Sequence, residues 1–482
     1  MQLETSCIKR VYEMEYKWIV LTNTTLAILM ASLDANIVII ALPKISSDLH
    51  ASIFETIWVV LSYGLVTTTV LLSFGRLADM FGRVKLYNLG LIVFTVGSAL
   101  CGFSNSGQEL ILFRIVQALG AAFLFSNSAA ILTDAFDVKE RGKALGLNQV
   151  SIVVGSVTGL VLGGLLTDTL GWRSIFWVNV PIGVFGAIWS HVKLRELGTK
   201  TGGRIDWIGN CFLASGLILL LLGLTLGPLQ MLSKIVELLM IFGGLALLIL
   251  FVFAESKIDD PMFDVKLFRL RIFTTGNFSV FLNAIARGAL ILIMTFYLEG
   301  PTMKLSALEA GLYLIPVSFT MATFGPISGW LSDKYGSKFF IIGGLLISAV
   351  GFLILTRLQP HENFSHLLIP LVLVGSGMGM FAAPNRTAVM NSVPAHRRGT
   401  ASGMTTTLVT LGNILSLGLS FLIITQTVPI SDLEAIFTGG NANFTNAVNF
   451  VNSIHVIFFL SAAVLFASII PSIIERPPKP QD

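Results

Sequence analysis

Asp34 and Arg114 are the two residues of this chain whose types and positions indicate proton chemistry. Each stands inside a long apolar segment, and as membrane helices these segments would place them about 8 and 6 residues from the same membrane face. A carboxylate at that depth has to be protonated or paired with a cation. Burial favours the protonated acid and a nearby guanidinium favours the carboxylate, so the pair can bind and release a proton. We predict proton coupling at this pair; a static ion pair that joins two helices is the alternative.

A third ionisable residue, Arg287, lies about 15 residues into another apolar segment, with no obvious acidic partner. It could bind a substrate, pair with Asp34 in one conformation, or bond carbonyl groups and water. Six polar residues are our candidates for a substrate cavity: Asn36, Gln117, Asn148, Gln149, Arg287 and Tyr313. For each of them a hydrogen bond between helices is the alternative.

The composition identifies the elements that carry these residues. Of the 482 residues 54% are hydrophobic and only 12% are charged, and the mean hydropathy is +0.82. Soluble chains have roughly 25% charged residues, so this is an integral membrane protein. The apolar runs of about 20 residues indicate helices and exclude a membrane β-barrel. The net charge of +4 implies no nucleic-acid partner.

Enzymatic chemistry has no support in the sequence. No Gly-x-x-x-x-Gly-Lys-[Ser/Thr] loop is present, which excludes ATP hydrolysis by this chain. The six histidines are dispersed and form no ligand cluster, so we expect neither a metal nor a cofactor.

The hydropathy pattern predicts an all-α membrane protein with fourteen spans. We place them near residues 18–42, 55–74, 84–104, 108–131, 143–168, 171–193, 206–227, 232–254, 272–298, 306–332, 337–357, 366–390, 399–425 and 452–474. About 12 residues remain for each connecting segment, so no loop can hold a catalytic domain. The longest connection on the outer side is the segment near 426–451.

Lys and Arg residues in the loops predict the orientation. About 24 of the 31 fall on one side of the fourteen spans and 5 on the other, and Arg114 and Arg287 lie within spans. Because positive charge is enriched in cytoplasmic loops, both termini are predicted to be cytoplasmic, in a multi-pass protein of the plasma membrane.

An internal repeat divides the chain. An Asp-x-x-Gly loop occurs at Asp79 and again, in the second half of the chain, at Asp333. An Arg-Gly pair follows each loop at a closely similar spacing, at Arg141 after the first and at Arg398 after the second. Two six-helix bundles are therefore expected, related by a pseudo-two-fold axis along the membrane normal, with two extra helices between them. The predicted units are residues 1–193, a linker with two spans at 194–271, and residues 272–482.

These motifs resemble the major facilitator superfamily, in particular its fourteen-span drug:proton antiporter branch. The resemblance covers essentially the whole chain and is carried most strongly by the loop Gly75-x-Leu-Ala-Asp79-x-x-Gly82-Arg83. It implies a conformational-switch loop formed by Gly75, Asp79, Gly82, Arg83, Arg141, Asp333, Gly336 and Arg398. The segment Arg114-x-x-Gln117-x-x-Gly resembles the fourth-helix motif to which the family's proton coupling is assigned.

The fifth predicted span contains closely spaced glycines that resemble the family's antiporter signature. They are Gly155, Gly159, Gly163 and Gly164. Ser156 and Leu160 stand where that signature favours prolines, and this departure weakens the inference of antiport without affecting the fold. A face for helix packing is the alternative interpretation.

The resemblance implies a monomeric secondary transporter in the lipid bilayer. Its expected activity is the export of lipophilic, drug-like or toxic small molecules in exchange for protons, by alternating access. The alternative is a gradient-driven uptake carrier or facilitator for an organic metabolite, including an anionic one. A non-transporting scaffold or sensor would have no soluble output domain in this chain.

Overall fold

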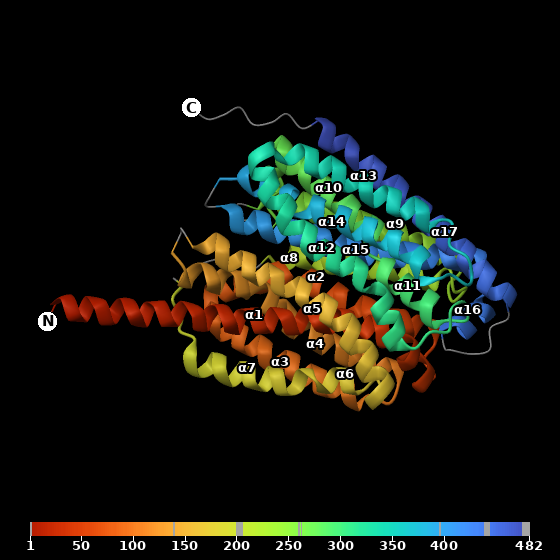
Figure 1. Cartoon of the computed structure of the whole chain (residues 1–482), viewed down its shortest axis with the longest axis horizontal. Coiled ribbons are helices and arrows are strands. Elements are labelled where there is room, and N and C mark those ends of the chain that lie inside the picture. Colours follow the sequence, from red (N-terminus) through yellow and green to blue (C-terminus); the bar gives the residue numbers. More distant parts are fainter. Residues whose placement is uncertain are drawn as a thin grey trace.

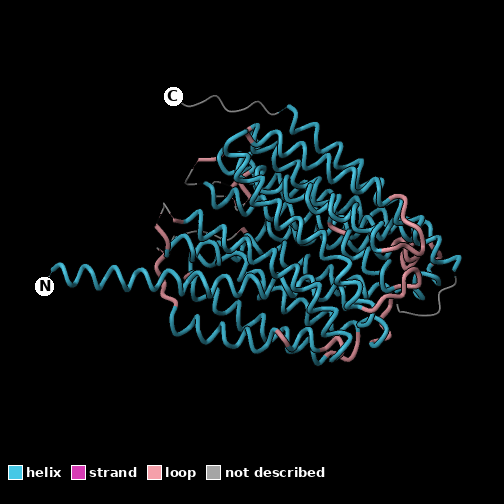
Figure 2. The backbone as a smooth tube through the Cα atoms, viewed as in Figure 1, coloured by secondary structure: helices cyan, strands magenta, loops and turns pink. Residues whose placement is uncertain are grey.

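The computed structural model describes residues 2–137, 140–198, 206–258, 261, 263–394, 397–437 and 444–474. All regular secondary structure in these ranges is helical (Figure 2). Fourteen helical spans in the described part of the chain are long and apolar enough to cross a membrane, which confirms the predicted number.

The first bundle contains six spans. They are formed by α1 (Gln2–Asp48), α2 (Ile53–Phe81), α3 (Arg83–Phe103), α4 (Gly107–Ala135), α5 (Arg141–Leu170), and the pair α6 (Ser174–Trp177) and α7 (Asn179–Lys193). Serines begin two of these helices, because the Ser52 and Ser106 hydroxyls accept hydrogen bonds from backbone N–H groups in the first turn. The first span runs over Tyr16–Asp48 and is longer at both ends than the sequence predicted.

The two extra spans lie beside both bundles. They are α8 (Trp207–Leu226) and α9 (Lys234–Lys257), followed by the short helix η1 (Val265–Arg269). On α8, the Thr225 hydroxyl accepts a hydrogen bond from the Trp58 indole of α2 at 3.2 Å. A Cβ atom added at Gly418 of the second bundle would lie 3.3 Å from the Leu224 side chain. The α8 helix therefore contacts both bundles, and α9 covers it from outside.

The second bundle also contains six spans. They are formed by the pair α10 (Arg271–Arg287) and α11 (Leu290–Glu299), then α12 (Ala307–Tyr335), α13 (Ser337–Leu355), α14 (Phe364–Asn391), α15 (Arg398–Thr427) and α17 (Phe444–Ile474), with the short α16 (Ile430–Phe437) before the last span. The outer connection predicted near 426–451 contains the short helix α16, and α17 begins within it at Phe444. Residues 438–443 lie outside the described part.

The ninth span is broken where the sequence predicted one continuous helix. A Cβ atom on Gly288 would lie 2.6 Å from the Asn413 Cα of α15, so only glycine permits this close approach. Beyond the break, the Ala289 N–H donates to the Ser416 hydroxyl of α15 at 3.0 Å. This side chain replaces the helical acceptor that the break removes.

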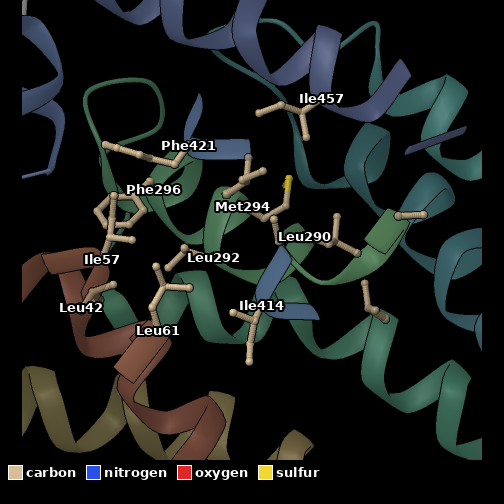
Figure 3. Packing of buried hydrophobic residues seen from close by; sticks show 14 of the residues in the cluster. Leu42, Ile57, Leu61, Leu290, Leu292, Met294, Phe296, Ile414, Phe421 and Ile457 are labelled. Carbon is tan, nitrogen blue, oxygen red and sulfur yellow. The ribbon is translucent and has the colours of Figure 1, made fainter. Parts of the chain in front are cut away.

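The bundles lie side by side, and the start of α1 and the end of α17 are on the same side of the molecule (Figure 1). We call this the terminal side and the opposite one the far side. Toward the far side the bundles meet through apolar side chains. Figure 3 shows Leu42 and Ile57 of the first bundle near Leu292 and Phe296 of α11.

Candidate functional site

Asp34 of α1 is completely buried, with 0% of its surface exposed. Its Oδ2 atom lies 2.6 Å from Nη1 of Arg114 on α4, and its Oδ1 atom accepts hydrogen bonds from Gln117 and Asn179, both at 2.8 Å. Neighbouring helices thus supply three donors to one carboxylate. The acid and the guanidinium that were matched by depth in the sequence are in direct contact.

Arg114 is equally enclosed, with 1% exposure. Besides Asp34, its guanidinium donates to the Gln117 side-chain oxygen at 2.7 Å and to the Val59 carbonyl at 3.4 Å. Its Cζ atom lies 4.1 Å from the centre of the Tyr63 ring, where the face of the ring attracts a cation. The cation is therefore held by a carboxylate, an amide, a carbonyl and an aromatic face.

Ser98 of α3 completes this network. Its hydroxyl accepts hydrogen bonds from Gln117 at 3.1 Å and from Asn179 at 3.2 Å, and donates to the Phe176 carbonyl at 3.0 Å. We did not predict Ser98 or Asn179 as site residues. Asn179 is a polar residue in an apolar segment, at the start of α7. This feature of the sequence could have identified it as a site residue.

Asp34 differs in depth from every other acid of the described spans. The others lie in the first or last turn of a span, whereas Asp34 lies close to the middle of the span Tyr16–Asp48. Its negative charge can be balanced by Arg114 or by a proton. Protonation would remove the charge that holds Arg114 and the two amide donors in place. The carboxylate therefore joins α1 to α4 and α7, and Ser98 links α3 to the same network.

The first switch loop carries a charged network on the terminal side. Arg83 contacts Asp79 at 2.8 Å and Asp134 of α4 at 2.7 Å. Glu196 accepts the backbone N–H groups of Arg83 at 2.6 Å and Val84 at 3.1 Å, which places a negative charge at the N-terminus of α3. We did not predict Asp134 or Glu196.

Glycines shape the turns of this loop and its repeat. Gly82 has φ +119° and Gly336 has φ +87°, a conformation that favours glycine. Gly75 lies on α2, where an added Cβ would be 3.8 Å from Ser126 of α4.

The repeat of this loop differs at Asp333 and Arg398. The side chains of Asp333 and Arg398 are exposed, and neither forms a hydrogen bond or ion pair with another described residue. Arg397, next to Arg398, instead contacts Asp264 of the linker at 2.6 Å. In the first repeat, Arg141 donates to the Phe136 carbonyl at 2.9 Å.

The four glycines of α5 serve two contacts. Cβ atoms added at Gly155, Gly159 and Gly163 would lie 2.7, 2.7 and 3.0 Å from carbonyl oxygens of α1. A Cβ added at Gly164 would instead lie 2.4 Å from the carbonyl oxygen of Ala307, at the start of α12. Three glycines therefore pack within the first bundle, and Gly164 joins the two bundles on the far side.

The cavity candidates of the first bundle are dispersed. Asn36 donates to the Ser156 hydroxyl of α5 at 3.2 Å, and Gln117 belongs to the Asp34 network. Asn148 is buried, and its Nδ2 atom has no hydrogen-bond partner among the described residues. Its neighbour Gln149 is exposed. The structure does not bring these four residues into one site.

The second bundle holds the other two candidates, on different helices. Tyr313 of α12 is half-buried and packs edge-on against Phe364, with ring centres 4.7 Å apart. Arg287, at the end of α10, is half-buried and has no hydrogen bond or ion pair within the described ranges.

An apolar pocket lies between the bundles, toward the far side. Its lining includes Ile57 of α2, Ala289, Leu292 and Phe296 of the ninth span, and Leu417 and Phe421 of α15. Figure 3 shows Ile57 facing Phe296 in this region. Nearly all of its lining is apolar, and Ser420 is its one polar lining residue in the described part of the chain.

Comparison with known proteins relates the chain to one large group of transporters. The family model of the Major Facilitator Superfamily matches residues 24–417, and a second match covers residues 276–482. The chain is 33% identical to the riboflavin transporter RibZ of Clostridioides difficile (strain 630) over 85% of this chain and 88% of that protein. It is 32% identical to the multidrug resistance protein Stp of Mycobacterium tuberculosis (strain CDC 1551 / Oshkosh) over 80% of this chain and 71% of that protein.

Solved structures show the same fold. A bacterial homologue of the human lysosomal transporter Spinster, in an inward-facing and unoccupied conformation, has a TM-score of 0.66 and 17% identity, covering 95% of this chain and 96% of that one. At this identity the similarity concerns the fold alone.

Proposed function

The chain belongs to the major facilitator superfamily of membrane transporters, and we propose that it exports lipophilic, drug-like small molecules in exchange for protons. The observation that carries the proposal is the buried Asp34, whose two oxygens are bonded by Arg114, Gln117 and Asn179. An ionisable group at this depth marks a functional site by default. The similarity to the multidrug resistance protein Stp supports drug-like substrates.

The proposed cycle uses the proton to change contacts within the first bundle. A proton on Asp34 neutralises the carboxylate, so Arg114 loses its counter-charge and the helices that meet at the network can shift. Alternating access also requires the far-side contact between Gly164 and Ala307 to open. One charge that crosses about 150 mV supplies roughly 3.5 kcal/mol, enough to drive uphill export.

The remaining parts of the proposal concern the membrane. We propose that the chain acts as a monomer in the plasma membrane, with the terminal side in the cytoplasm. The moving bodies are residues 1–193 and 272–482, and the linker at 194–271 supplies the two additional spans. The contacts of α8 with Trp58 and Gly418 support a linker that remains packed against both bundles.

Purified protein in liposomes with an imposed pH gradient tests the exchange. Asp34→Asn should abolish dye movement driven by the gradient, because the amide cannot bind and release a proton. Asp48→Asn is a matched control on the same helix, since Asp48 contacts only the exposed Lys44 at 2.9 Å among described residues. Gradient-driven transport that survives Asp34→Asn at the wild-type rate would rule out proton exchange at this residue.

The alternative is a gradient-driven uptake carrier or facilitator for an organic metabolite. The similarity to the riboflavin transporter RibZ favours it, as does Arg287, which has no partner among the described residues. Counterflow of a metabolite at a rate that does not depend on pH would support this alternative over proton-driven export.

A further inference from the structure

Arg287 is a charged residue in the middle of a span, without a counter-ion among the described residues. It stands well inside the ninth span, several turns from both Arg271 and Glu299 at its two ends. No described residue forms a hydrogen bond or ion pair with it. A guanidinium at this depth is costly unless a partner satisfies it.

The position of Arg287 around the helix directs it inward. Gly276 of α10 packs against Asn385 and Val389 of α14. Arg287 follows Gly276 by about three full turns plus 20°, so both residues share the α14 side of α10. Phe278, 51% exposed, marks a different side of the helix. The partial exposure of Arg287 is therefore directed toward the interior of the protein.

An unpartnered amide donor lies next to Arg287. Asn283, one turn earlier on α10, is 5% exposed, and its Nδ2 atom has no hydrogen-bond partner in the described ranges. Buried polar groups are nearly always hydrogen-bonded, so a buried amide donor beside an unpartnered guanidinium indicates an acceptor from outside the chain.

The apolar pocket between the bundles lies on a different face of the ninth span. Ala289 and Leu292, which line the pocket, follow Arg287 by about 200° and 140° around the helix. The Arg287 site is therefore defined by its polar groups and not by this pocket.

We infer that Arg287 and Asn283 form the head-group site of the transported substrate, and that this substrate is an organic anion such as a carboxylate. A guanidinium binds a carboxylate through two parallel hydrogen bonds, and the Asn283 amide adds a third donor. The inference rests on the proposed transport function, since it names the class of molecule that the carrier moves.

A matched pair of probes tests the inference. Purified protein is titrated with 11-(dansylamino)undecanoic acid and with its methyl ester, and binding is measured by dansyl fluorescence. The wild type should bind the acid more tightly than the ester. Arg287→Gln should weaken binding of the acid about 10- to 100-fold and leave the ester unchanged, with Arg287→Lys in between. Asn283→Ala should cause a smaller loss, again for the acid only.

Three results would overturn the inference. They are equal wild-type affinity for acid and ester, an Arg287→Gln protein that loses both probes in parallel, and an Arg287→Gln protein that loses neither. The wild-type comparison and Asn283→Ala keep the test decisive if Arg287→Gln does not fold.

The same probes separate this inference from the proposed exchange. Asp34→Asn should retain the preference for the acid over the ester while it loses gradient-driven transport. If Asp34→Asn transports normally and the acid preference depends on Arg287, proton exchange fails and the head-group site stands. If the acid preference is absent and Asp34→Asn is inactive, the head-group site fails and proton exchange stands.

Discussion

The two bundles each place one ionisable residue at mid-span, and they treat its charge in different ways. In the first bundle both oxygens of Asp34 have donors from neighbouring helices, and the residue is fully buried. In the second bundle Arg287 is partly exposed and has no partner in the described part of the chain. The charge of Asp34 is therefore neutralised by residues of its own bundle. The charge of Arg287 has no such counter-ion among the described residues.

The internal repeat allows the positions of Asp34 and Arg287 in their bundles to be compared. Gly155 and Gly412 make equivalent contacts, to Ser32 of α1 and to Ala284 of α10, so these two partners correspond in the repeat. Three residues further on, Ala35 corresponds to Arg287. The acid and the base thus sit at the same depth of their bundles, one residue apart in register. One residue is about 100° around a helix, which is enough to turn a side chain from the bundle interior toward a different neighbour.

Stability should show the largest difference between the two charges. Arg114→Gln leaves the Asp34 carboxylate buried without its cation, and removing one partner of a buried pair costs about 3–5 kcal/mol. Arg287→Gln removes a charge that has no partner among the described residues, so stability should stay the same or rise. Thermal unfolding in one detergent, followed by tryptophan fluorescence, measures both. Equal losses would mean that Arg287 has a structural partner after all.

The far-side contact should show the next largest effect. Gly164→Ala introduces a Cβ atom 2.4 Å from the Ala307 carbonyl oxygen, and overpacking of this kind costs about 1–3 kcal/mol. We expect the bundles to separate there, so that Ile57→Cys is labelled faster by a membrane-impermeant maleimide when the native cysteines are replaced by serine. Gly146→Ala is the control, because nothing among the described residues lies within 4 Å of its added Cβ. Unchanged labelling would contradict a closed contact at Gly164.

The two switch loops should show the smallest difference. Asp134→Asn weakens the contact to Arg83, and exposed or half-buried pairs of this kind contribute about 1 kcal/mol or less. Asp333→Asn should have no measurable effect, since its side chain is exposed and has no partner among described residues. Thermal unfolding and transport rate check both variants. An equal response of the two loops would contradict the asymmetry described above.

Much of the fold follows from the sequence because long apolar runs fix where a chain crosses a membrane. The fourteen spans agree with prediction, and counting residues from the membrane face was enough to match Asp34 with Arg114. Such counting gives depth but not rotation about the helix axis. For that reason it could not assign Gly164 to the other bundle, or bring Ser98 and Asn179 to Asp34. The partners of Arg83 are Asp134 near the end of α4 and Glu196 in the segment after α7, which only packing brings together.

The break in the ninth span has a consequence for how the second bundle can move. Arg287 belongs to α10, while Leu292 and Phe296 belong to α11, and the joint between these two helices rests on the Ser416 hydroxyl and the Gly288 contact. Bending at this joint would change the angle between α10 and α11. The charged residue and the wall of the apolar pocket would then move by different amounts when the bundle tilts, although they belong to one span.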